Sequence, residues 1–115
     1  MKIQVTQDDI DQGTMQDCYS CPVARAINRI LAAGCECEVG SKDIFIRRCE
    51  EPIGRIVMSF KTPALVAKFI RTFDRGIKPE INMTRLAFSD VLMIGPFEFY
   101  LDIPEILTDA ASVKV

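Results

Sequence analysis

Residues 35–49 read CECEVGSKDIFIRRC and decide the fold, because they have the pattern of a β-hairpin. The first five residues place two cysteines and a valine on one face of a strand and two glutamates on the other. A polar turn at 40–42 leads into a second run, 43–49, which contains isoleucine and phenylalanine. We therefore expect two antiparallel strands over this stretch.

A helix is expected on the N-terminal side of the hairpin, over residues 22–33. Pro22 suits its first position, because proline lacks the N–H group that would have no partner there. Gly34 is a suitable left-handed residue to end the helix. The helical period separates an apolar stripe from a polar face, with Val23, Ile27, Ile30 and Leu31 on the first and Arg25, Asn28 and Arg29 on the second.

A second helix is expected after residue 62. Thr62 is a suitable cap, and Pro63 fits the first turn. Gly76 would close this helix. Its expected buried side consists of Leu65, Val66, Phe69, Ile70 and Phe73.

Three more strands and one short turn complete the expected elements. Residues 2–6 and 97–103 alternate between apolar and polar, and residues 55–60 also have the composition of a strand. Thr6 is expected to cap a brief polar turn over 7–12.

Periodicity does not assign residues 77–95, whose apolar runs fit either a strand or a buried helical turn, and we treat this stretch as an insertion. The order of the other elements predicts an α+β fold with a single domain over residues 1–115. We expect a mainly antiparallel sheet of four to five strands, with two principal helices on one face.

The composition is that of one globular domain. The chain has 115 residues, of which 49% are hydrophobic and 26% charged, and its net charge is −2. No run approaches the ~20 apolar residues of a membrane span, and the first residues lack the apolar core of a signal peptide. We therefore expect a cytoplasmic protein with no membrane partner. Histidine, the commonest general base, is absent, and we expect the protein not to be an enzyme.

The five cysteines allow three interpretations. The C-x-x-C pair at residues 18–21 could join two later cysteines in an all-thiolate zinc site. Alternatively, a helix N-terminus beside Cys21 would lower the pKa of its thiol and favour redox chemistry. The preferred interpretation is that the cysteines are small core residues, with no cofactor. The candidate zinc ligands are Cys18, Cys21, Cys35 and Cys37.

Basic residues gather in the middle of the chain, with a helical stripe near residues 68–75 and further arginines in the neighbouring strands. Such a group could hold an anionic nucleotide or a phosphate backbone, although a solvated helix face is the simpler interpretation. The negative net charge argues against a nucleic-acid partner. The candidate ligand-binding residues are Arg47, Arg48, Arg55, Lys68, Arg71 and Arg75.

Four segments together resemble a family of small, uncharacterised proteins of bacteriophages and prophages. They are VTQDDID at 5–11 with Gly13, CYSCPVARA at 18–26, FIRTFDRG at 69–76 and PFEFYLDIP at 96–104. The segment between the last two, 77–95, is longer than the connector of that family.

The resemblance implies an accessory protein in the host cytosol that binds a host component and counters host defence. It would act by occupying a host protein or by sequestering a small anionic nucleotide signal. The apolar residues at 86–94 and 97–100 also lead us to expect self-association into a homo-oligomer. The alternative is a small zinc- or thiol-containing domain that contacts nucleic acid.

Overall fold

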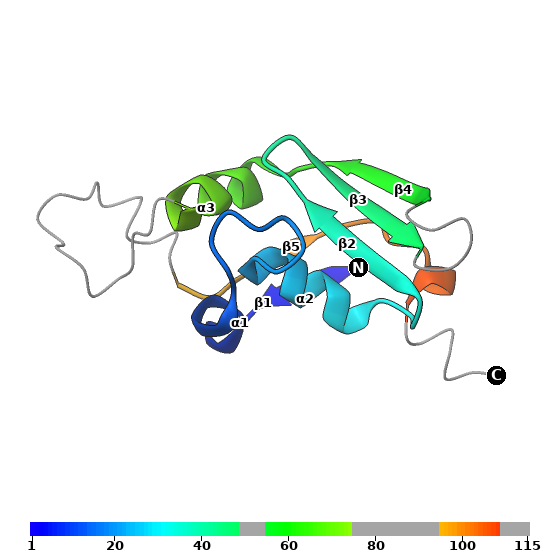
Figure 1. The fold of residues 1–115 in the computed structure, drawn as a ribbon, viewed down its shortest axis with the longest axis horizontal. Helices are drawn as coiled ribbons and strands as arrows, with labels where there is room; N and C mark the ends of the chain where they lie inside the picture. The colour runs from blue at the N-terminus through cyan, green and yellow to red at the C-terminus, as the bar shows by residue number, and fades with distance from the viewer. Residues whose placement is uncertain (49–54, 75–94, 109–115) are drawn as a thin grey trace, which may run out of the picture.

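The computed structural model describes residues 1–48, 55–74 and 95–108, and over these ranges the protein has the predicted α+β fold. The strands form two antiparallel sheets, one of three strands and one of two (Figure 1). In chain order the elements are β1 (Lys2–Val5), α1 (Gln7–Gln12), α2 (Pro22–Ile30), β2 (Cys35–Val39), β3 (Asp43–Arg48), β4 (Ile56–Lys61), α3 (Ala64–Asp74), β5 (Phe97–Tyr100) and the 3₁₀ helix η2 (Glu105–Leu107).

The predicted hairpin is confirmed as β2 and β3, which belong to the three-stranded sheet β2-β3-β4. Cys37 pairs with Ile46 and Val39 pairs with Ile44, and all four side chains are buried. The alternation therefore has the expected effect: alternate positions turn inward, and the glutamates of β2 face outward.

The five strands do not form one sheet, which differs from the expectation. β1 pairs with β5, so the two-stranded sheet joins segments from opposite ends of the described chain. Helix α2 packs against both β1 and β2 and thus lies between the two sheets rather than on one face of a single sheet (Figure 1). Val23 and Ile27 are fully buried at this position.

Helix α2 ends at Ile30, three residues before the predicted end. Leu31 has extended backbone and forms an isolated β-bridge with Thr108, and Ala32 N–H donates to the Leu107 carbonyl (2.9 Å). These long-range hydrogen bonds replace those of a further helical turn. Gly34 does have positive φ (87°), as predicted, but in the turn before β2.

Helix α3 buries Phe69 completely, with its ring centroid 4.7 Å from that of Phe97 and 5.8 Å from that of Phe73. The prediction that Leu65 is buried is wrong, because this side chain is 43% exposed. Leu65 lies in the first turn of the helix, at the edge of a buried face centred on Val66 and Phe73. The Thr62 hydroxyl donates to the Gly40 carbonyl (2.7 Å) and ties the start of this helix to the hairpin turn.

Several predictions concern residues outside the described ranges: the insertion up to residue 94, the helix end at Gly76, and the positions of Cys49 and Arg75. Within the part of the chain that the structure describes, no helix is long and apolar enough to cross a bilayer.

Candidate functional site

Three segments of the chain surround a hollow of about 570 Å³, which we call the Cys18 hollow. The segments are the loop before α2, the turn between β2 and β3, and the last two turns of α3. Its floor is apolar and its rim is polar. The lining residues are Gln16, Asp17, Cys18, Cys21, Val39, Gly40, Ser41, Ile70, Arg71 and Asp74.

The loop on one side of the Cys18 hollow is held by hydrogen bonds at both of its ends. Gln16, whose φ is +57°, donates its backbone N–H to the Asp74 carboxylate (2.9 Å) at the end of α3. The Asp17 carboxylate accepts from the N–H of Tyr19 (2.9 Å), and the Cys18 carbonyl accepts from the N–H of Val39 (2.8 Å). The hollow is therefore preformed.

Cys21 is the N-cap of α2, and its Sγ accepts a hydrogen bond from the N–H of Ala24 (3.4 Å). Its side chain is buried at 5% exposure, and burial raises the pKa of the Cys21 thiol to about 11. Burial and the nearby Glu38 carboxylate also raise the pKa of the half-buried Cys18. The expectation that the helix start lowers the thiol pKa is wrong, because desolvation outweighs the helix dipole here.

The four candidate zinc ligands are free thiols, and they are not arranged as a metal-binding group. Cys18 lies beside Val39, whereas Cys35 is at the other end of the same strand. Cys37 is fully buried between them, and burial raises the pKa of its thiol. Within residues 1–48, 55–74 and 95–108, no group of three or more cysteine or carboxylate side chains is placed to hold a metal ion. Cys21 and Cys37 are core residues, as the preferred interpretation expects.

The predicted basic residues that the structure describes do not form one cluster. Arg48 and Arg55 are joined by a backbone hydrogen bond (2.9 Å) at one end of the three-stranded sheet. Helix α3, which carries Lys68 and Arg71, begins near its other end, where Asp43 pairs with Lys61 (Figure 1). The remaining described candidate, Arg47, forms an ion pair with Glu38 (2.8 Å).

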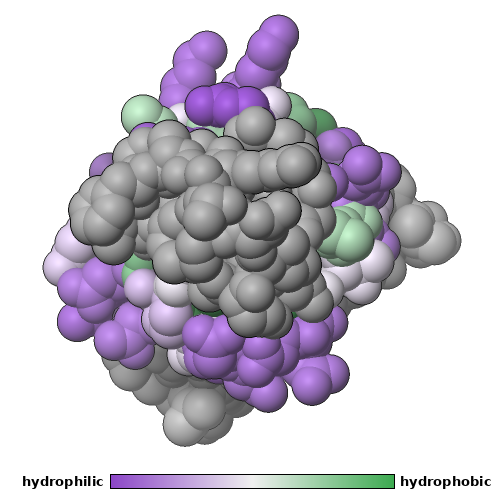
Figure 2. Space-filling model, turned by 90° about the vertical axis from the view of Figure 1, so that its left-hand side faces the viewer, coloured by the Kyte–Doolittle hydropathy of each residue, from purple (hydrophilic) through white to green (hydrophobic). Residues whose placement is uncertain are grey.

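Figure 2 views the molecule from the α3 end. The described side chains that are visible on this face are mainly hydrophilic, with small hydrophobic areas between them.

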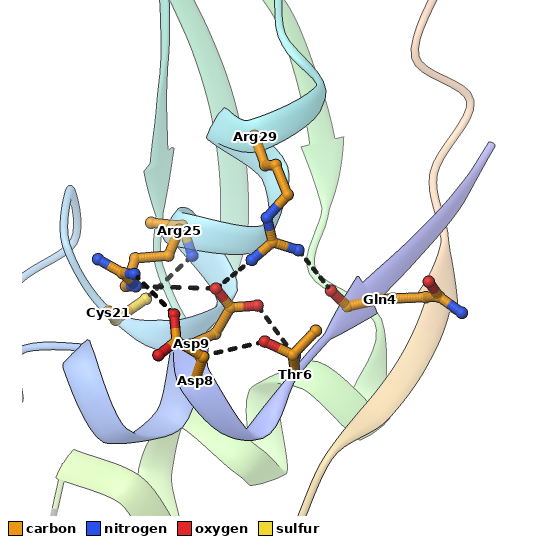
Figure 3. A network of polar contacts seen from close by, with 8 residues as sticks. Gln4, Thr6, Asp8, Asp9, Cys21, Arg25 and Arg29 are labelled. Atoms are coloured by element: carbon orange, nitrogen blue, oxygen red, sulfur yellow. Dashed lines mark hydrogen bonds and ion pairs between the residues drawn. The ribbon is translucent and has the colours of Figure 1, made fainter.

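A buried carboxylate, Asp9, lies at the centre of a charged network between α1 and α2 (Figure 3). Its Oδ2 accepts from the N–H of Thr6 (2.9 Å), and its own N–H donates to the Thr6 hydroxyl (3.2 Å), which completes a capping box. Its Oδ1 accepts a hydrogen bond from Arg29 and lies 3.7 Å from Nε of Arg25. Asp8 adds an ion pair to Arg25 (3.6 Å) at the surface.

Burial alone would raise the pKa of Asp9, but the hydrogen bonds from Arg29 and Thr6 and the charge of Arg29 lower it below 3.8. Arg25 and Arg29 line a second, polar hollow, but both are paired with carboxylates. We therefore assign the network to stability. The sequence signal for it was the Thr6-x-x-Asp9 spacing, whereas the two arginines were expected only to face solvent.

No protein-family model, curated protein or solved structure matches this chain. The resemblance to phage and prophage proteins accordingly stays a prediction.

Proposed function

We propose that the protein is a non-enzymatic binding protein that receives its partner at the Cys18 hollow. The observation that carries this proposal is a preformed hollow with an apolar floor, made by Cys21, Val39 and Ile70, under a polar rim. Concave sites with an apolar lining and a few polar groups are the common form of ligand and side-chain pockets.

A protein partner fits this hollow better than a nucleotide. The rim has two carboxylates, Asp17 and Asp74, and one guanidinium, Arg71, so that its charged groups sum to −1. This net negative charge would repel an anionic ligand. A side chain with an apolar body could contact the floor, and its hydrogen-bond donor could reach the rim carboxylates. Of the two modes that the phage resemblance suggests, we therefore favour occupation of a host protein over capture of an anionic signal.

The proposal is tested by filling the hollow with a bulky side chain. Ser41 is exposed on the rim, and Ser59 is an exposed serine on β4 that does not line the hollow. We expect Ser41→Trp to lose the host component that the wild-type protein retains in a pull-down, and Ser59→Trp to keep it. Mass spectrometry of the retained proteins and small molecules identifies the partner.

Equal retention by both tryptophan variants would contradict the use of this hollow. If nucleotides raised the melting temperature of the wild type but not that of Ser41→Trp, the partner would be an anionic ligand rather than a protein. Zinc in the purified protein, together with salt-sensitive binding of DNA or RNA, would support the alternative of a metal-containing nucleic-acid domain.

A further inference from the structure

Two thiols, Cys18 and Cys21, line the same hollow and differ in accessibility. Cys18 is half-buried and open to the hollow, whereas Cys21 is buried at the start of α2. Neither is in a disulfide. A buried thiol next to an accessible one is the arrangement in which one cysteine reacts with a solute and the other resolves the product.

The backbone between these cysteines places them on one helix-like turn. The N–H groups of Ser20 (3.3 Å) and Cys21 (3.0 Å) both donate to the Asp17 carbonyl, so the segment forms a tight, helix-like turn. Side chains three residues apart in a helical turn have Cβ atoms about 5–6 Å apart, and a disulfide needs about 3.5–4.5 Å. Bond formation therefore needs a shift of about 1–2 Å at the half-buried Cys18.

We propose that Cys18 is a site of thiol–disulfide exchange with small, uncharged disulfides, and that Cys21 is its resolving thiol. In the first step the Cys18 thiolate attacks the small disulfide, forms a mixed disulfide and releases one small thiolate, which takes up a proton. In the second step Cys21 gives up its proton and attacks Sγ of Cys18, which releases the second small thiol. The two protein thiols are oxidised, and one small disulfide is reduced to two thiols.

Other described cysteines are less suited to this exchange. Cys37 is fully buried in the sheet and has no access to a solute. Cys35 is half-buried, but it lies at the far end of β2 from Cys18. Sγ of Cys21 accepts a hydrogen bond from the N–H of Ala24 (3.4 Å), and because a disulfide sulfur is also a weak acceptor, we expect the helix start to be retained after oxidation.

The test uses the full chain, folded, with bis(2-hydroxyethyl) disulfide at about pH 9, because burial and Glu38 raise the pKa of the Cys18 thiol and leave little thiolate at neutral pH. Intact mass under non-reducing conditions is expected to fall by about 2 Da, the mass of two hydrogens. Peptide mapping should place the bond between Cys18 and Cys21.

Single variants separate the two roles. Cys21→Ser keeps a side-chain cap on α2 and should accumulate a mercaptoethanol adduct of about 76 Da at Cys18. Cys18→Ser should form neither product at this site, and Cys35→Ser should behave like the wild type. The proposal would be overturned if the folded wild type formed no Cys18–Cys21 bond or formed a bond from Cys18 to Cys37. It would also be overturned if Cys21→Ser formed no adduct at Cys18. No partner enters the experiment, so this proposal and the proposed function can fail separately.

Discussion

Replacing Asp9 by asparagine removes one negative charge from the network between α1 and α2 and leaves the shape of the side chain unchanged. Asparagine can still accept from the N–H of Thr6, so the change acts mainly on the contacts to Arg25 and Arg29. Asp9→Asn is therefore a direct measure of what the buried charge contributes to the free energy of unfolding.

The exposed fractions of the side chains set the size of the effect. Asp9 is 1% exposed, but Arg29 is 48% and Arg25 37% exposed, so both guanidinium groups can regain water when the carboxylate is lost. Breaking a fully buried pair costs about 3–5 kcal/mol, and breaking a surface pair about 0–1 kcal/mol. We expect an intermediate loss of about 2 kcal/mol near pH 7.

The pH dependence gives a second, independent measurement. The pKa of Asp9 is lower in the folded protein than its usual value of 3.8. Its contribution is therefore fully present well above that pH, and it disappears as the pH falls through the depressed pKa. The difference between wild type and Asp9→Asn should narrow below about pH 4.

Urea unfolding followed by circular dichroism at a series of pH values measures both quantities. Asp8→Asn is the matched control, because Asp8 forms an ion pair with the same Arg25 but is 74% exposed, and it should change stability by less than about 0.5 kcal/mol. The reasoning would be refuted if the two variants were equally stable at neutral pH. It would also be refuted if the loss in Asp9→Asn were the same at acid pH.

Four further substitutions have expected outcomes that follow from the burial and contacts of the residues they replace. Burial raises the pKa of Cys21 from 9.0 to about 11, so between those pH values the thiol ionises in the unfolded state but not in the folded state. This thiol should therefore lower the free energy of unfolding of the wild type by up to about 3 kcal/mol over that range, and urea titrations should show a smaller decrease for Cys21→Ser. Gly13→Ala would place its Cβ 2.6 Å from Cδ of Pro22, and we expect a cost of about 1–3 kcal/mol; an unchanged melting temperature would contradict this. Phe69→Ala should cost about 3–5 kcal/mol, and Leu65→Ala, at a 43% exposed position, less than about 1 kcal/mol by chemical unfolding.

The local elements were predictable wherever one short-range pattern decided them. The period of two in β2 and β3 determines which side chains face inward. Thr6 marks the start of α1 through hydrogen bonds within one turn, and Pro22 marks the start of α2 because its missing N–H needs no partner there. The end of α2 was not predictable, because its last turn competes with the bridge from Leu31 to Thr108, a contact with no local signal.

The candidate sites were also predictable only where a short-range pattern determined them. The Cys18–Cys21 pair was visible from its spacing, but the sign of the pKa shift depended on burial, which the spacing does not report. The basic residues looked like one group because they are close in sequence, whereas strand β4, which lies between Arg48 and Lys68, places these two residues at opposite ends of the three-stranded sheet. The partners of Asp9 on α2 were hidden for the opposite reason, because they lie far from it in sequence.

The pairing of β1 with β5 has a consequence for synthesis of the chain. Residues 2–5 pair with residues 97–100, so β1 has no partner strand until residues 97–100 have been synthesised. At typical ribosomal rates this wait lasts on the order of ten seconds. During that time the apolar side chains of Ile3 and Val5 and an open strand edge are available to chaperones or to other nascent chains. Closure of this long loop is therefore expected to be a late step in folding.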